Sequence, residues 1–287
     1  HILRSHPRTS RDPAGAQGSI TMIRQADSAA RSIAAHRGVS AVFPENTRRA
    51  FEEAVICGAD AIEFDIQVTA DLEIVICHNP ALDHYGYPEV EIATSTLAEL
   101  QALDIGRTFG RKFVGERLMT LAELLQDFGM RIPLYVEFKT KHMHPRHVEA
   151  LLSGFLELTS GVHDSMDLHG LCFDQGVLCE LAMSADWLPL VWNTNKPQNI
   201  QASELSEQPW LSAVGCRIGN LTRRTADLIH AAGLQLFSFT CNSEFEVLQA
   251  RGMRADSIIT DAPVRTRRIL NQAASCPVTL RTGSVSN

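Results

Sequence analysis

Hydrophobic and polar positions along the chain form blocks of two kinds. Short runs rich in Ile, Val, Leu and Ala end in polar residues, and stretches with apolar residues three to four positions apart follow them. The first pattern predicts buried strands and the second predicts amphipathic helices. The eight predicted strands are Ser32–His36, Ala61–Ile66, Leu134–Lys139, Gly170–Phe173, Leu188–Trp192, Ala213–Arg217, Leu234–Thr240 and Ser257–Thr260. The predicted helices are Thr47–Cys57, Leu121–Phe128, His147–Leu158, Gly176–Ser184, Ala202–Gln208, Arg223–Ala231, Glu244–Ala250 and Val264–Gln272.

Strands that alternate with helices predict a parallel sheet, and eight such units fit a closed (β/α)₈ TIM barrel of the α/β class. Residues 67–119 break the alternation, because this segment is too long for a connecting loop. It is expected to form a small insertion after the second strand. Its beginning, Ala70–Leu72 followed by Glu73–His78, predicts a turn and a strand that returns beside Glu63–Val68.

Both ends of the chain differ from this barrel region. Residues 1–31 are rich in Arg, Ser, Ala and Gly without apolar periodicity, and they are expected to be a flexible leader. An organelle transit peptide is the alternative. Residues 32–272 are expected to form the barrel domain, and residues 273–287 a loose polar tail. No apolar run approaches the ~18 residues of a membrane span.

Composition narrows the classes of partner. The 287 residues are 45% hydrophobic and 21% charged, which is typical of globular proteins. The formal net charge of −7 argues against nucleic acid, although a small phosphate ligand needs only a local basic cluster. Seven cysteines without CxxC spacing predict buried free thiols and a reducing, cytoplasmic location. The oligomeric state stays open.

Candidate metal ligands lie at the ends of two predicted strands. Glu63 and Asp65 share one strand face, as do Glu137 and Lys139 on the next barrel strand. Neighbouring strands lie ~4.8 Å apart, so Glu137 is placed to join the other two carboxylates. Three hard oxygen ligands favour Mg²⁺ or Ca²⁺ over zinc. The simpler alternatives are solvated strand-end acids and a Glu137–Lys139 ion pair.

Two histidines lie close to these carboxylates in the predicted topology. His36 ends the first strand and is followed by Arg37, whose planar fork matches phosphate oxygens. Counting outward from the hairpin turn places Cys77 opposite Asp65, and therefore places His78 near the acids. Two histidines that flank a divalent cation and an arginine can act as an acid–base pair around a bound phosphate. The alternatives are a capped strand end with a surface arginine, and an incidental His78.

Seven short strings, in order along the chain, give it a wider resemblance. AHRG followed by FPENT, then AIEFDIQVTAD, IVICHN, YVEFK, FTCN and IITDAP resemble the glycerophosphodiester phosphodiesterase family. The match extends from about Ile33 to Pro263. The resemblance implies a (β/α)₈ barrel with a small insertion after the second strand. It also implies metal-dependent hydrolysis of glycerophosphodiesters to sn-glycerol 3-phosphate and an alcohol.

The resemblance also implies a role for each candidate residue. The cation, Mg²⁺ or Ca²⁺, is expected on Glu63, Asp65 and Glu137, with His36 and His78 as the general acid–base pair. The phosphate is expected on Arg37 and Lys139. Glu45 and Asn46 are expected to support the site near His36 and Arg37. From their positions at the ends of the seventh and fifth strands, Phe239 and Trp192 are expected to line its mouth. Which histidine is the acid stays open.

This chain departs from the family pattern at several positions. The family usually has His-Asp where this chain has His78-Asn79, and Asp-Gly where it has Asp71-Leu72. His84 takes the place of a frequent arginine, and Phe239 that of a tryptophan. Two other functions stay open. One is a phospholipase D-like enzyme acting on lysophospholipids, and the other is a non-catalytic barrel that binds a phosphate ligand.

Overall fold

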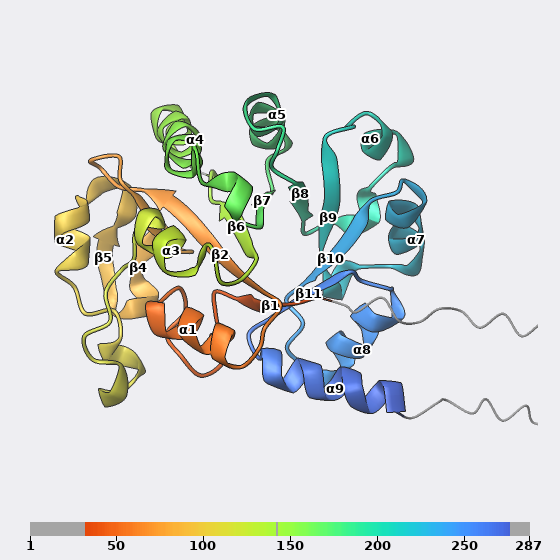
Figure 1. Ribbon diagram of the computed structural model, residues 1–287, viewed down its shortest axis with the longest axis horizontal. Helices are drawn as coiled ribbons and strands as arrows, with labels where there is room; N and C mark the ends of the chain where they lie inside the picture. Colours follow the sequence, from red (N-terminus) through yellow and green to blue (C-terminus); the bar gives the residue numbers. More distant parts are fainter. Residues whose placement is uncertain (1–31, 142, 276–287) are drawn as a thin grey trace, which may run out of the picture.

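The computed structural model describes residues 32–141 and 143–275, and this part of the chain folds around a ring of eight parallel strands (Figure 1). Each strand pairs with the next in the order β1, β2, β6, β7, β8, β9, β10 and β11, and β11 pairs again with β1. The strands are β1 Ser32–His36, β2 Ala61–Val68, β6 Leu134–Phe138, β7 Leu168–Cys172, β8 Leu190–Thr194, β9 Leu211–Arg217, β10 Gln235–Phe239 and β11 Ser257–Thr260. The predicted (β/α)₈ barrel is confirmed.

Helices surround this ring in Figure 1. They are α1 Arg48–Ile56, α3 Leu121–Phe128, α4 Pro145–Thr159, α5 Gln175–Ser184, α6 Ala202–Ser206, α7 Arg223–Ala231, α8 Glu244–Gly252 and α9 Pro263–Ser275. The capping boxes at Thr120 and Ser243 form, because each hydroxyl accepts the third backbone N–H of its helix and the following glutamate bonds back. These side chains fix where α3 and α8 begin.

Some boundaries differ from the predicted ones. β8 covers Leu190–Thr194 instead of Leu188–Trp192, so the strand extends past Trp192. α9 continues to Ser275, three residues beyond the expected barrel boundary at 272. The expected leader, residues 1–31, and most of the expected tail lie outside the described residues. Because β8 extends past Trp192, Asn193 and Thr194 belong to the strand and not to the loop that follows it.

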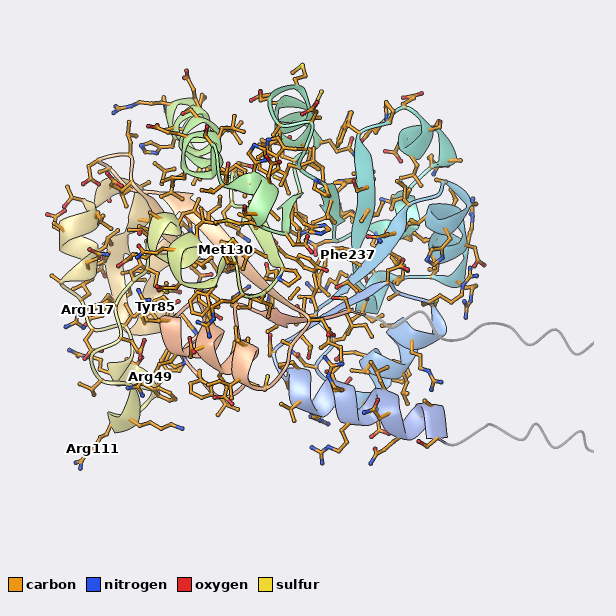
Figure 2. All side chains as sticks on the ribbon, viewed as in Figure 1. Arg49, Tyr85, Arg111, Arg117, Met130 and Phe237 are labelled. Atoms are coloured by element: carbon orange, nitrogen blue, oxygen red, sulfur yellow. The ribbon has the colours of Figure 1, made fainter. Side chains whose placement is uncertain are left out.

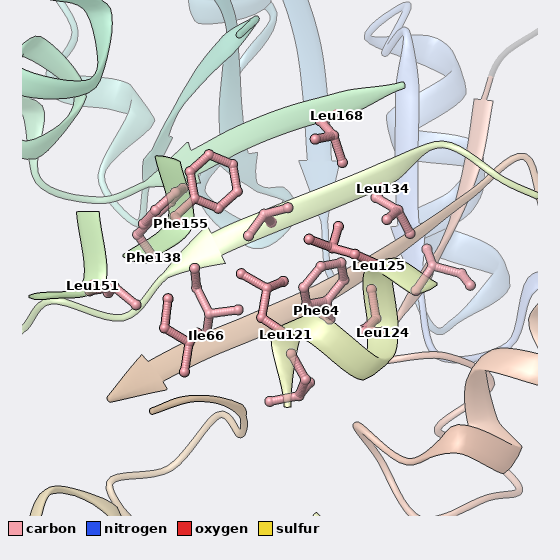
Figure 3. Close-up of a cluster of buried hydrophobic side chains, with 14 of the residues drawn as sticks. Phe64, Ile66, Leu121, Leu124, Leu125, Leu134, Phe138, Leu151, Phe155 and Leu168 are labelled. Atoms are coloured by element: carbon pink, nitrogen blue, oxygen red, sulfur yellow. The ribbon is translucent and has the colours of Figure 1, made fainter. Parts of the chain in front are cut away.

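Two apolar layers hold the barrel together. Between strands and helices, Phe64 and Ile66 of β2 pack with Leu121 and Leu124 of α3, as Figure 3 shows. Phe51 of α1 is fully buried there. Its ring meets those of Phe64 and Phe128 edge to face, with ring centroids 6.1 and 5.8 Å apart. Inside the ring a smaller cluster includes Ala34, Tyr135, Leu171, Val191 and Phe237. Figure 2 labels Phe237 in the middle of the barrel.

The segment between β2 and α3 forms the predicted insertion. β3, Ile74–Ile76, returns antiparallel to β2, while β4 (Ala81–Leu82) and β5 (Tyr87–Glu91) form a separate two-stranded sheet. α2, Leu97–Gln101, begins with a capping box at Thr96. The insertion has its own buried apolar cluster, which includes Val75, Leu82, Tyr85, Ile92 and Leu100. In Figure 1 it lies to one side of the barrel, beside α1 and α3.

The register of the β2–β3 hairpin agrees with the one predicted by counting residues outward from the turn. Ile66 pairs with Ile76, and the backbone N–H of Cys77 donates to the carbonyl of Asp65 at 3.0 Å. Leu72 in the turn has a φ of 66°, the left-handed region that glycine adopts without strain. The strand itself ends at Ile76, so His78 follows β3 instead of lying on it.

The described residues bear on the predicted free thiols and on the predicted lack of a membrane span. The six cysteines of the described residues are free, and four of them are buried: Cys77, Cys172, Cys216 and Cys241. Cys57 is half-buried and Cys179 is exposed. Among the described residues, no helix combines the length and the apolar character needed to cross a membrane.

The packing of Phe51 predicts how much its ring contributes to the free energy of unfolding. Phe51→Ala removes a fully buried ring from the layer between α1, β2 and α3. We expect the free energy of unfolding to fall by about 3–5 kcal/mol, measured by urea denaturation. Phe245→Ala is the matched control, because that ring is 76% exposed and its loss is expected to change stability by less than about 0.5 kcal/mol. Equal effects of the two substitutions would contradict this packing.

Candidate active site

Three carboxylates converge at the carboxyl end of the barrel strands. Asp65 of β2 pairs in register with Glu137 of β6, and Glu63 lies two residues earlier on β2. One oxygen from each of the three lies within 4.8 Å of the others, and their residues are between 1% and 8% exposed. The two-residue period of a strand places all three on the inner face, while Phe64 and Phe138 face the helix layer.

This crowding separates the acidities of the two carboxylates on β2. Burial, together with the charge of Asp65, raises the pKa of Glu63 to about 8. Burial also acts to raise the pKa of Asp65, but the charges of Lys139 and Arg37 outweigh it and hold that pKa at about 2. At neutral pH, Asp65 is therefore ionised and Glu63 holds a proton.

Two cations lie against the carboxylates. The Nζ of Lys139 donates to Glu137 Oε1 at 2.7 Å and lies 3.5 Å from Asp65 Oδ1. The guanidinium of Arg37 lies with its Nε 3.3 Å from Asp65 Oδ2, and its NH1 donates to both oxygens of Glu45 at 2.9 Å. Asp65 thus has a positive charge on either side, which offsets the cost of burying it.

The loop after β1 shapes this corner of the site. Arg37 and Asn46 both have a φ of 56°, and the following Gly38 has a φ of 81°. A Cβ on Gly38 would lie 2.6 Å from the Cβ of Ala50, so glycine lets the loop pass close to α1. Asn46 is fully buried and its Nδ2 donates to Asp65 Oδ2 at 3.1 Å.

The insertion supports the same loop. The hydroxyl of Tyr85, which lies in the buried cluster of the insertion, donates to the carbonyl of Glu45 at 2.9 Å. His84 lies beside it, with its Nε2 3.9 Å from Glu45 Oε2. Tyr85 thereby fixes the backbone of Glu45, and the Glu45 carboxylate in turn holds Arg37.

His36 is held by an acid at the end of β11. Its Nδ1 lies 2.6 Å from Asp261 Oδ1, and its Nε2 lies 3.9 Å from Glu63 Oε2. Asn242 donates to the other oxygen of Asp261 at 2.5 Å and accepts the backbone N–H of Asp261 at 2.9 Å. Burial acts to lower the pKa of His36, but Glu63 and the hydrogen bond to Asp261 outweigh burial and raise it.

His78 has a neutral partner instead of an acid. Its Nδ1 lies 2.7 Å from the amide oxygen of the adjacent Asn79. Burial lowers the pKa of His78, and the nearby charge of Asp65 only partly opposes this effect. The two histidines therefore differ in their support, because His36 is backed by a carboxylate and His78 by an amide.

Asn193 of β8 is a further inward-facing group that the sequence reasoning missed. Its Nδ2 donates to Glu137 Oε2 at 3.2 Å, and the residue is 2% exposed. A Cβ on Gly215 of β9 would lie 2.0 Å from Asn193 Oδ1, so only glycine leaves room for this amide. The residue lies in the part of β8 that extends beyond the predicted strand.

The expectation that Trp192 lines the pocket is wrong. Strand alternation places Val191 and Asn193 inside the barrel, so the indole between them faces outward. There Trp192 packs against the two apolar clusters between strands and helices. Phe239 does lie on the inner face, where it packs on the interior cluster and makes an edge contact with Phe173 at 5.9 Å.

Most of the predicted site residues come together, but two residues that support them were not predicted. The structure brings Glu63, Asp65 and Glu137 together, with Arg37 and Lys139 against them. Asp261 and Asn242 were part of the quoted IITDAP and FTCN strings but received no role. Their signal was their position at the same end of the barrel as His36, since Asp261 directly follows β11 and Asn242 lies in the loop after β10.

Comparison with known proteins agrees with this geometry. The Glycerophosphoryl diester phosphodiesterase family matches residues 36–265. YhdW of Bacillus subtilis, a candidate glycerophosphodiester phosphodiesterase, is 30% identical over 237 residues, covering 80% of this chain and 94% of YhdW. A glycerophosphodiester phosphodiesterase of the same organism is 26% identical, covering 80% of this chain and 83% of that protein.

The fold is also shared with solved structures. A phosphodiesterase from Oleispira antarctica, determined in complex with the product sn-glycerol-3-phosphate, aligns with a TM-score of 0.75 at 23% identity. The alignment covers 84% of this chain and 96% of that one. With the family match over most of the barrel, these findings show that the chain belongs to the glycerophosphoryl diester phosphodiesterase family.

Proposed function

We propose that this protein hydrolyses glycerophosphodiesters to sn-glycerol 3-phosphate and an alcohol, with a divalent cation and a pair of histidines. The observation that carries the proposal is the convergence of Glu63, Asp65 and Glu137 beside two cationic side chains at the open end of the barrel. Family membership supports the reaction class. Enzymes with this barrel fold have their catalytic groups at the carboxyl-terminal end of the strands, where these side chains lie.

The three carboxylates fit a divalent cation. They offer oxygen donors only, which suits Mg²⁺ or Ca²⁺. The raised pKa of Glu63 reflects repulsion from Asp65 in a buried place, and a bound cation would relieve this repulsion. When bound, the cation would neutralise charge on the phosphodiester and acidify a coordinated hydroxyl.

Arg37 and Lys139 are proposed to hold the phosphate. Both side chains are partly exposed, at 16% and 21%, so each can reach a ligand in the barrel mouth. Glu45 and Asn46 keep this part of the site in place, because one binds the Arg37 guanidinium and the other binds Asp65. Phe239 lines the mouth on the opposite side.

His36 and His78 are proposed to transfer protons. In each ring Nδ1 is engaged, by Asp261 in one case and Asn79 in the other, so Nε2 is the atom left for the substrate. The Asp261 carboxylate stabilises a protonated His36, which we assign as the donor to the departing alkoxide. His78, backed by a neutral amide, is assigned to accept the proton of the attacking hydroxyl.

The proposal also concerns the compartment. All six cysteines of the described residues are free thiols, and four of them are buried in apolar surroundings. Free thiols persist where the glutathione and thioredoxin systems keep proteins reduced. We therefore place the reaction in the cytoplasm.

The function is tested by product analysis. Incubation of glycerophosphocholine with the protein and Mg²⁺ or Ca²⁺ is expected to release sn-glycerol 3-phosphate and choline, and a chelator is expected to stop the release. Lysophosphatidylcholine, offered in parallel, is expected to react more slowly. Preferred cleavage of lysophosphatidylcholine would favour the phospholipase D-like alternative, and no cleavage of either would favour a non-catalytic barrel.

Cation affinity is expected to depend on pH through Glu63. Below its raised pKa of about 8, Glu63 holds a proton that the cation must displace. The apparent Kd for Mg²⁺ is therefore expected to fall about ten-fold from about pH 6 to pH 7 and to level off above about pH 8. Calorimetric titration measures this dependence directly. Glu63→Gln should bind Mg²⁺ more weakly and without this pH dependence, and a pH-independent wild type would contradict the assignment.

The proton-transfer roles predict graded losses. His36→Ala and His78→Ala are each expected to lower kcat by about 10²–10⁴ with the thermal unfolding profile retained. Asp261→Asn keeps a hydrogen-bonding group but removes the charge, so it is expected to lower kcat less and to lower the pKa of His36. Steady-state kinetics across pH and NMR titration of His36 measure both effects.

His230 supplies the control for these variants. It lies on the outer helix α7, so His230→Ala is expected to keep wild-type kinetics within about two-fold. Full activity in His78→Ala would refute the role of the β2–β3 hairpin in catalysis. An unchanged His36 titration in Asp261→Asn would show that the carboxylate does not support the imidazolium.

A further inference from the structure

Arg217 is a cationic side chain on the inner face of the barrel mouth that the proposed reaction does not use. It is the last residue of β9, where Ala213 lies in the interior apolar cluster while Val214 and Cys216 pack toward the helices. The two-residue alternation places Arg217 on the same face as Ala213. It is exposed, and it lies at the carboxyl end of the strand.

The strand order fixes its position relative to the carboxylates. β9 is four strands from β2 in either direction around the eight-stranded ring, so Arg217 lies across the mouth from Glu63 and Asp65. On one side, Phe239 of β10 pairs with it in register. Two residues before it on β9, Gly215 leaves room for the amide oxygen of Asn193 on the neighbouring β8. A substrate that spans the mouth from the carboxylates would end near Arg217.

Arg217 differs from the other two inner-face cations in its surroundings. Arg37 is held by Glu45 and Asp65, and Lys139 by Glu137 and Asp65. Within the described residues, the Arg217 guanidinium has neither a carboxylate within 4.0 Å nor a hydrogen-bond partner. Its five donors are free to meet a ligand.

The adjacent loop strengthens the positive charge there. The residue facing Cys216 on β8 is Thr194, and the loop that follows it carries Lys196, whose exposed side chain likewise has no partner among the described residues. Asn220 donates to the carbonyl of Asn195 at 2.8 Å and ties the loops after β8 and β9 together. This sector of the mouth thus carries two cations, and no acid of residues 32–141 or 143–275 pairs with either.

A solvated arginine on an outer helix would need no explanation, but the position of Arg217 is different. The phosphate shared by all glycerophosphodiesters is already matched by Arg37 and Lys139 on the opposite side. A third cation on the inner face, across the mouth and unpaired with any acid of the described part of the chain, is suited to a second negative charge. The planar fork of arginine binds phosphate or carboxylate oxygens in pairs.

We propose that Arg217 recognises an anionic group on the leaving alcohol, so that the preferred glycerophosphodiesters carry a second phosphate or a carboxylate on that alcohol. The inference rests on the proposed phosphodiesterase function and specifies its substrate class. Phe239 supplies an apolar wall beside this group, and Lys196 adds to the field that attracts it.

A matched pair of substrates tests the inference. Glycerophosphoinositol 4-phosphate and glycerophosphoinositol share one alcohol and differ by one phosphate. The wild type is expected to show a kcat/KM about ten-fold higher for the phosphorylated substrate, the size of one charge-assisted hydrogen bond. Arg217→Gln is expected to reduce this ratio to about one. Arg268→Gln, an equal change of charge on the exposed face of α9, is expected to retain it.

Binding without turnover separates this inference from the proposed function. Calorimetric titration with inositol 4-phosphate is expected to show about ten-fold weaker binding to Arg217→Gln than to Arg268→Gln. Hydrolysis of both substrates with a wild-type ratio near one would overturn the inference and leave the phosphodiesterase function in place. An equal fall in kcat/KM for both substrates in Arg217→Gln would overturn it as well. If neither substrate is hydrolysed, the function fails, and equal binding to the two variants would overturn the inference independently.

Discussion

The mutual repulsion of three buried carboxylates is the constraint around which this site is arranged. Glu63, Asp65 and Glu137 lie within 4.8 Å of one another on the inner face of two adjacent strands. Such a group is stable only with compensating charge and hydrogen bonds. Lys139 and Arg37 supply the charge, and a raised pKa keeps a proton on Glu63. The same features suit the group to a divalent cation.

Support for these side chains comes from segments that are distant in the sequence. The insertion reaches the loop after β1 through the hydrogen bond from Tyr85 to Glu45, and β11 reaches β1 through Asp261 and His36. Asn193 extends from β8 to Glu137 of β6, and Gly215 on the neighbouring β9 leaves room for its amide oxygen. The ring of strands therefore serves as a frame in which each group is positioned by a neighbour from another strand.

The mouth of the barrel divides into two sectors of different chemistry. On one side lie the carboxylates with Arg37 and Lys139, whose positive charges are balanced by those acids. On the other side lie Phe239 and Arg217, where the positive charge has no acid among the described residues. In the proposed binding mode, a substrate with one phosphate in the first sector would extend its alcohol toward the second. The proposed preference for an anionic alcohol follows from this division.

The sequence by itself determined the eight strands, the insertion and most of the charged groups, because these depend on local periodicity and on strand faces. Counting from the hairpin turn placed Cys77 opposite Asp65, and the structure has that register. Trp192 was misplaced because it was expected at the end of its strand, whereas β8 continues to Thr194 and Trp192 shares the outward face with Leu190. The contacts of Asp261 with His36 and of Asn193 with Glu137 were decided only by closure of the ring, which brings together residues 225 and 56 positions apart.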